Sequence, residues 1–362
     1  MKKFIDPYGS ELVDDYGKLI REFGIEQFDL DQFPEPNSLM RRGIIFGGRD
    51  LKVISECVRN RKPFYVLSGI MPTAKKIHLG NKMVVESIKY FQEHGADTYI
   101  LVADMEAAAA RGIDLKAARQ NALEFHIPAY VALGLDPKKT TFYFQSDNRD
   151  VLMLAYEFAK RITLAEFTAI YGSAEPGRIM SAVTQVGDIL YPQLRHRMPG
   201  IIPVGIDQDP HIRLTRDIAS RTKSKYHFFP PASMYQKYMP SLDGSMKMSK
   251  SQQDSVIELP EDVKSAQRKI RNALSGGRAT MEEHRKLGAD LEQDMVFELL
   301  KFHLIEDDRE LQKIHDEYKS GKLLSGELKQ IACDKIAIFM EKFEKDLDKA
   351  RKNIDKLNFV KF

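Results

Sequence analysis

Residues 64–81 read FYVLSGIMPTAKKIHLGN, and this stretch decides which fold the chain adopts. It opens with an aromatic and β-branched run that predicts a buried strand, and an amphipathic segment near 81–94 that predicts a helix follows it. Gly80 lets the backbone approach a ligand closely because glycine has no Cβ. The start of the helix offers backbone N–H groups and a positive dipole end. We therefore expect an anion site here, to which His78 and Asn81 add side-chain donors.

Short apolar runs and longer amphipathic segments alternate as far as about residue 260. Further strands are predicted at 98–102, 141–144, 201–204 and 226–229, and further helices near 115–133, 149–170 and 209–221. The last of these helices should begin with Asp209 as its N-cap and Pro210 at its first helical position. The alternation predicts an α/β fold with a parallel sheet, in which the strand before His78 ends at the ligand-binding edge.

Beyond residue 259 only helical patterns follow. One helix should start at Pro260, and a longer one carries an apolar stripe at three- and four-residue spacing. The stripe consists of Ile336, Phe339, Met340, Phe343, Leu347, Ala350 and Ile354. We therefore divide the chain into an N-terminal extension at 1–62, an α/β domain at 63–260 and a helical C-terminal domain at 261–362.

Composition excludes several classes of protein. The 362 residues include 55 basic and 52 acidic ones, a net charge of +3, whereas proteins that coat nucleic acid nonspecifically are far more basic. No apolar run reaches the roughly 18 residues that a membrane span needs, and residues 1–15 lack the apolar stretch of a secretory signal, so we expect a cytoplasmic protein. Cys57 and Cys333 have no metal-ligand or redox spacing and are predicted to be buried free thiols.

A second string that can handle phosphate is KMSKS at 247–251, after a turn-rich segment. Its two lysines, Lys247 and Lys250, can follow negative charge as it develops on departing pyrophosphate. An isolated lysine pair would more simply be a solvated loop. Its occurrence after a His-x-Gly-Asn string favours the phosphate-binding interpretation instead.

These two strings resemble the HIGH and KMSKS signatures of class I aminoacyl-tRNA synthetases, with Asn81 in place of the final histidine. The strings GIDQDPHIRLTRD at 205–217, SGGRATMEEHR at 275–285 and RRGIIFGGRD at 41–50 resemble the tryptophanyl-tRNA synthetases of archaeal and eukaryotic type. The resemblance covers nearly the whole chain. It implies a Rossmann-like catalytic domain with an inserted helical dimerisation segment at about 105–200, and a helical C-terminal domain that binds the anticodon.

The resemblance also implies roles for individual residues. Residues implied to bind ATP are Gly69, His78, Gly80, Asn81, Gly205, Asp207, Lys247, Met248, Ser249 and Lys250, of which His78, Asn81, Lys247 and Lys250 are catalytic. Residues implied to bind the amino acid are Leu67, Glu106, Gln185, Asp188 and Gln208. Glu106 and Gln185 would hold the ammonium and carboxylate of the substrate, and Gln208 would also bind the head group of the amino acid. Asp207 would contact the adenosine ribose.

Asp188 is the most informative of these residues. It lies in a mostly apolar stretch, where a buried carboxylate needs a partner. Its alignment with bacterial tryptophan enzymes implies that it accepts the indole N–H. Tyrosine enzymes carry an aspartate at the equivalent site, so Asp188 alone does not select the substrate. Leu67 stands where the archaeal tyrosine enzymes have a tyrosine, and Leu101 stands where the eukaryotic tryptophan enzymes have their indole-binding glutamine. The resemblance therefore implies a pocket with one carboxylate and otherwise apolar walls.

The implied activity is that of a tryptophan–tRNA ligase, a homodimer that uses ATP with bound Mg²⁺ and charges tRNA(Trp). Lys329, Lys335, Lys342 and Lys345 could contribute to an anticodon contact, although interleaved acidic residues favour a solvated face for most of them. The alternatives are a tyrosine–tRNA ligase and a non-catalytic synthetase paralogue that binds RNA. A dinucleotide-dependent oxidoreductase is not supported, because no G-x-G-x-x-G string follows the first strand.

Overall fold

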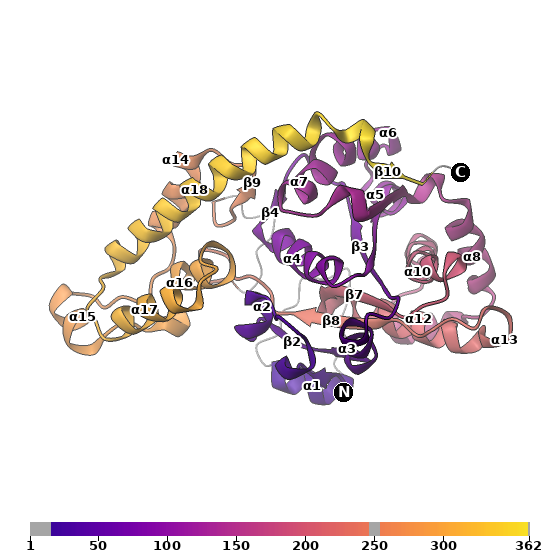
Figure 1. Cartoon of the computed structure of the whole chain (residues 1–362), viewed down its shortest axis with the longest axis horizontal. Coiled ribbons are helices and arrows are strands. Elements are labelled where there is room, and N and C mark those ends of the chain that lie inside the picture. Colours follow the sequence, from indigo (N-terminus) through magenta and orange to yellow (C-terminus); the bar gives the residue numbers. More distant parts are fainter. Residues whose placement is uncertain (1–15, 246–253, 361–362) are drawn as a thin grey trace.

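A computed structural model of the chain describes residues 16–245 and 254–360, and it contains an eight-stranded sheet with helices packed against it (Figure 1). In spatial order the strands are β1 (Glu26–Gln27), β2 (Ile45–Arg49), β8 (Ala232–Gln236), β7 (Gly200–Gly205), β3 (Tyr65–Ile70), β5 (Asp97–Val102), β6 (Thr140–Phe144) and β10 (Asn358–Phe359). All neighbours from β8 to β10 are parallel, whereas β1 and β2 are antiparallel additions. This arrangement confirms the predicted α/β fold with a parallel sheet.

The order of the strands creates a topological switch point between β3 and β7. The chain runs outward from β3 to β5 and β6, then returns to place β7 and β8 on the other side of β3. β3 pairs with β5 along all six residues, but with β7 only at Tyr65–Gly200 and Val66–Ile201. The carboxyl ends of β3 and β7 therefore separate, which is where open α/β sheets bind ligands.

Helices surround this sheet and form the C-terminal region. Those between residues 16 and 226 are α1 (Tyr16–Phe23), α2 (Ser38–Arg41), α3 (Leu51–Asn60), α4 (Leu79–Glu93), α5 (Asp104–Arg111), α6 (Leu115–Asn121), α7 (Ile127–Ala132), α8 (Arg149–Ala159), α9 (Leu164–Tyr171), α10 (Pro176–Leu190), α11 (Pro192–Arg195), α12 (Asp209–Arg221) and α13 (Lys223–Tyr226). The C-terminal ones are α14 (Val263–Asn272), α15 (Met281–Leu287), α16 (Met295–Leu299), α17 (Asp308–Lys319) and α18 (Ser325–Arg351). None of the helices in the described ranges is long and apolar enough to cross a bilayer.

The strands predicted at 98–102, 141–144 and 201–204 are confirmed as β5, β6 and β7, but the one predicted at 226–229 is wrong. Tyr226 ends α13, and the next strand, β8, begins only at Ala232, after two consecutive prolines that have no N–H to donate to a sheet. The aromatic run is apolar for another reason. Tyr226 stacks on Phe228 at 4.8 Å between ring centroids, and Phe228 is buried against Phe158.

The single helix predicted near 149–170 is also wrong, because the chain forms two helices, α8 and α9. Thr163 begins a new helix by capping α9, its hydroxyl accepting the backbone N–H of Glu166 at 3.2 Å.

The helices α8 and α10 pack closely against each other. A Cβ on Gly187 of α10 would approach the carbonyl oxygen of Val151 to 2.8 Å, so glycine is required where these helices pack.

The last helix returns to the sheet. α18 packs against α14 and α16 at one end and against α7 near the other, crossing the top of the view in Figure 1. Its predicted apolar stripe is buried or partly buried, although Ile354 lies beyond the end of the helix. The prediction of no strand after residue 259 is wrong, since β10 pairs with β6 and Phe359 stacks on Phe144 at 5.9 Å between centroids.

Cys57 and Cys333 are buried free thiols, as predicted.

Candidate functional site

A cavity of about 390 Å³ lies at the switch point between β3 and β7. Its walls include residues 67–69 of β3, residues 202–205 of β7 and the start of α4. The volume is in the range of sites that bind small molecules. The described residues that were predicted for the site and that line this cavity are Leu67, Gly69, His78, Gly80, Asn81, Glu106, Gln185, Gly205, Asp207 and Gln208.

The His-x-Gly-Asn string forms the start of α4. His78 is the N-cap, and its Nδ1 accepts the backbone N–H of Gly80 at 3.0 Å, while Asn81 Oδ1 accepts the N–H of His78 at 3.1 Å. In this contact Nδ1 of the His78 ring acts as the hydrogen-bond acceptor. A Cβ on Gly80 would lie 2.8 Å from the His78 ring, so a larger residue here would force the ring to shift.

The segment after the lysine-rich string is attached to this helix start. In a separate antiparallel pair, β4 (Ile77–His78) joins β9 (Glu258–Leu259). The N–H of Leu79 also donates to the carbonyl of Ile257 at 3.3 Å. Lys247, Met248, Ser249 and Lys250 themselves lie outside the described residues.

The last residue of β7, Gly205, and the turn after it, with Asp207 and Gln208, form another wall of the cavity. Tyr238 donates its hydroxyl to Asp207 Oδ1 at 3.0 Å, and Gln208 Nε2 donates to the other carboxylate oxygen at 3.2 Å. A Cβ on Gly205 would lie only 2.4 Å from Asp207 Oδ1. The glycine therefore lets the strand and the carboxylate pack together at the cavity.

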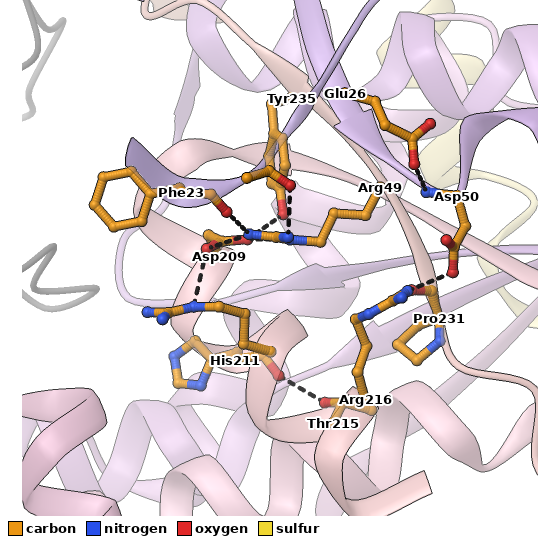
Figure 2. A network of polar contacts seen from close by, with 12 residues as sticks. Phe23, Glu26, Arg49, Asp50, Asp209, His211, Thr215, Arg216, Pro231 and Tyr235 are labelled. Carbon is orange, nitrogen blue, oxygen red and sulfur yellow. Dashed lines mark hydrogen bonds and ion pairs between the residues drawn. The ribbon is translucent and has the colours of Figure 1, made fainter. Parts of the chain in front are cut away.

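Asp209, directly after this turn, is buried in an ion-paired network (Figure 2). Its carboxylate accepts from Arg49 at 2.8 and 3.0 Å, forms an ion pair with Arg213 at 3.0 Å, and accepts the hydroxyl of Tyr235. Arg49 also donates to the carbonyl of Phe23 at 2.8 Å, which attaches α1 to the start of α12. The prediction of an Asp209 N-cap is wrong, because Asp209 is the first residue of α12 and Gln208 occupies the N-cap position.

A second, more exposed ion pair extends the same network. Arg216 of α12 donates to Asp50 at 2.6 Å and to the carbonyl of Pro231 at 2.9 Å (Figure 2). The backbone N–H of Asp50 donates to Glu26 at 2.9 Å. The segment before β3 thus contacts α12, the helix that follows the Asp207–Gln208 turn, through two ion pairs.

The other end of the cavity is mainly apolar, with Leu67 and Leu101 from adjacent strands among its walls. Glu106 from α5 and Gln185 from α10 supply polar groups there. Burial raises the pKa of Glu106. The side-chain oxygen of Gln185 is buried and has no hydrogen-bond donor within the described part of the chain.

Asp188 is not among the lining residues, although it was predicted to contact the substrate. It is fully buried, and its Oδ1 accepts the hydroxyl of Tyr143 at 3.1 Å while its Oδ2 accepts Gln145 Nε2 at 2.6 Å. Burial raises the pKa of Asp188 to about 8, against the opposing effect of these two donors. Gln145 lines the cavity, so Asp188 is one hydrogen bond away from it.

Sequence reasoning did not select Gln145. It directly follows β6, where the carboxyl end of a parallel strand places side chains at the ligand-binding edge. Glu106 likewise lies shortly after a strand, because α5 follows β5. Position alone could therefore have identified Gln145.

Comparisons with known proteins agree with this geometry. A family model described as tRNA synthetases class I (W and Y) matches residues 59–341. A tryptophan–tRNA ligase of Hyperthermus butylicus is 41% identical over 362 residues, covering 97% of this chain and 96% of that protein. One of Methanocaldococcus jannaschii is 40% identical over 357 residues, covering 96% of each. The crystal structure of tryptophanyl-tRNA synthetase from Aeropyrum pernix matches with a TM-score of 0.90 at 41% identity, covering 98% of this chain and 99% of that one.

Proposed function

The chain belongs to the class I tRNA synthetases of the tryptophan and tyrosine type, and from this membership we propose that it is a tryptophan–tRNA ligase. It activates L-tryptophan with ATP to tryptophanyl-adenylate and transfers the aminoacyl group to tRNA(Trp). The observation that carries the proposal is the single cavity at the switch point. The described residues implied for ATP and most of those implied for tryptophan line it together.

The first step is attack of the tryptophan carboxylate on the α-phosphate of Mg-ATP. No side chain need act as nucleophile or base, because the substrate carboxylate is already ionised. The protein contributes position and charge neutralisation. The start of α4 offers the positive end of a helix dipole to the triphosphate, beside the side chains of His78 and Asn81. Lys247 and Lys250 are proposed to neutralise the departing pyrophosphate.

The amino-acid end of the cavity supports tryptophan as the substrate. Leu67 and Leu101 give an apolar surface for a large aromatic ring. Glu106 and Gln185 offer hydrogen-bond acceptors to the ammonium group of the amino-acid substrate. The tryptophan–tRNA ligases that match over nearly the whole chain support the same choice.

Amino-acid-dependent ATP–pyrophosphate exchange tests this proposal, with tryptophan, tyrosine and phenylalanine compared at equal concentration. We expect exchange with tryptophan alone. Exchange with tyrosine only would contradict the proposed substrate, and no exchange from folded protein would favour a non-catalytic paralogue. Because the chain contains no tryptophan, fluorescence of the bound ligand provides a parallel binding titration.

We further propose that the protein acts as a homodimer. Several large apolar side chains in the helices after β6 are exposed, a pattern typical of a protein interface: Met153, Tyr156, Leu164, Met180 and Leu194. Light scattering on the purified protein should give twice the chain mass of 41.4 kDa. A monomer at micromolar concentration would contradict this proposal.

The helical region from residue 261 onward is proposed to contact the anticodon of the tRNA. Two of its lysines are already used within the chain, since Lys329 donates to the carbonyl of Ala273 and Lys335 pairs with Glu310 at 2.7 Å. Lys342 and Lys345 are the better candidates for an RNA contact. Replacing both by alanine should weaken tRNA binding while leaving pyrophosphate exchange unchanged.

A further inference from the structure

Gln145 has one buried hydrogen-bonding atom without a partner. The side chain is 1% exposed and lines the cavity, and its Oε1 accepts no hydrogen bond from any described residue. Its Nε2 donates to Asp188 at 2.6 Å. A buried amide oxygen that remains unpaired costs free energy, which a ligand with a suitable donor can recover.

The orientation of this amide follows from the groups behind it. An ionised carboxylate can only accept, so the NH₂ end of Gln145 must face Asp188 and the oxygen must face away. When Asp188 is protonated, the proton can lie on Oδ1 and be donated to the Tyr143 oxygen 3.1 Å away. Oδ2 then continues to accept from Gln145. The same amide orientation therefore fits both forms of Asp188.

The other unpaired amide oxygens on the cavity have different surroundings. Gln236 lies on β8 opposite Gly205, at the end with Asp207, and Gln185 lies on α10 near Glu106 at the end implied for the ammonium. Gln145 follows β6, the strand next to the one that carries Leu101. A single N–H on an aromatic ring needs one acceptor in mainly apolar surroundings, and Gln145 meets that requirement.

We propose that Gln145 Oε1 accepts the indole N–H of tryptophan, and that Asp188 is a positioning residue that holds the amide without touching the substrate. This inference rests on the proposed function. It assigns recognition of the indole to a carboxamide that is supported by a carboxyl group, in place of a direct aspartate contact. A substrate without the ring N–H leaves Oε1 unpaired, so the site discriminates against it.

The test compares tryptophan with 3-benzothienyl-L-alanine, in which sulfur replaces the ring N–H and the shape is nearly conserved. In pyrophosphate exchange, wild-type protein should prefer tryptophan in kcat/KM by roughly 10- to 100-fold. Gln145→Met removes the acceptor at similar size and should reduce that preference to within about threefold of unity. Gln120→Met is the matched control, because it makes the same substitution at an exposed glutamine that does not line the cavity, and it should keep the preference.

Asp188 is tested by the same ratio, which is measured within one sample and so tolerates partial loss of folded protein. Asp188→Leu should lower the preference for tryptophan, and Asp188→Asn, which keeps an acceptor for Gln145 Nε2, should restore most of it. In the Gln145→Met background, Asp188→Leu should have no further effect on the ratio, because the two residues act as one unit.

An unchanged preference in Gln145→Met would overturn the inference, and so would an equal effect of Asp188→Leu with and without Gln145. In both cases the wild-type exchange with tryptophan would still support the proposed function. Failure of wild-type protein to exchange with tryptophan at all would overturn both. The two failures are therefore distinguishable in one set of assays.

Discussion

Asp188 and Asp209 are both fully buried, lie on helices that pack together, and are close to the same cavity, yet their partners differ completely. Asp209 is paired with two guanidinium groups, those of Arg49 and Arg213. Within the described part of the chain, the donors to Asp188 are neutral: a tyrosine hydroxyl and a glutamine amide. Burial alone therefore does not define what a carboxylate does, since the presence of a countercharge decides it.

The difference separates a structural role from a role in recognition. The contacts of Asp209 join the segment before β3 to the start of α12, and both carboxylate oxygens have partners within the protein (Figure 2). Asp188 has a raised pKa of about 8 and is uncharged for much of its population near neutral pH. Such a group can orient the amide of Gln145 without placing a full charge beside an aromatic ring.

The largest change in the free energy of unfolding is expected when the ion pair between Arg49 and Asp209 is broken. Arg49→Met leaves the buried carboxylate of Asp209 with less compensation and should lower the free energy of unfolding by about 3 kcal/mol. Urea denaturation followed by circular dichroism measures this change. The control is Arg216→Met, whose partner Asp50 is 36% exposed and whose loss should cost less than about 1 kcal/mol. Equal losses in the two variants would contradict the contrast between buried and exposed pairs.

Replacing Asp188 by asparagine should change how the free energy of unfolding depends on pH. The folded-state pKa of Asp188 is raised above its unfolded value by burial and, in the same direction, by the nearby carboxylates of Glu106 and Asp104. Its protonated form therefore stabilises the fold fully below about pH 4, and that stabilisation is lost as the pH rises toward about 8. The stability of wild type minus that of Asp188→Asn should fall by roughly 1 kcal/mol per pH unit between pH 5 and 7. A difference that does not vary with pH would mean that Asp188 is ionised throughout.

A smaller effect is expected at Glu106, whose carboxylate is implied to hold the substrate ammonium. Burial raises its pKa, so the charged form is lost at less acidic pH than usual. The KM for tryptophan should therefore decrease with rising pH in wild type. Glu106→Gln should raise KM about 10-fold and flatten that dependence. An unchanged KM in this variant would place the ammonium elsewhere.

Local signals in the sequence predicted the parts of the fold that depend on neighbours along the chain. The strands β5, β6 and β7 follow from alternating apolar runs, and the close approach at Gly80 follows from its place between His78 and Asn81. The wrong strand at 226–229 shows the limit of composition, because Tyr226 and Phe228 pack against Phe158 and this segment forms no strand.

The features that the sequence did not predict depend on contacts between residues far apart in the chain. Arg49 lies 160 residues before Asp209, so no window of sequence could show that this aspartate is ion-paired and Asp188 is not. The two-residue strand β10 exists only because β6 offers an edge. The position of Gln145 between Asp188 and the cavity depends equally on where α10 packs against the sheet.

A crystal structure of the protein with bound tryptophan tests the central claim most directly. The account predicts the indole nitrogen within about 3.2 Å of Gln145 Oε1, with the Asp188 carboxyl beyond hydrogen-bond reach of the ligand and still bonded to Gln145 Nε2. An indole nitrogen in direct contact with Asp188, with Gln145 turned away, would contradict it.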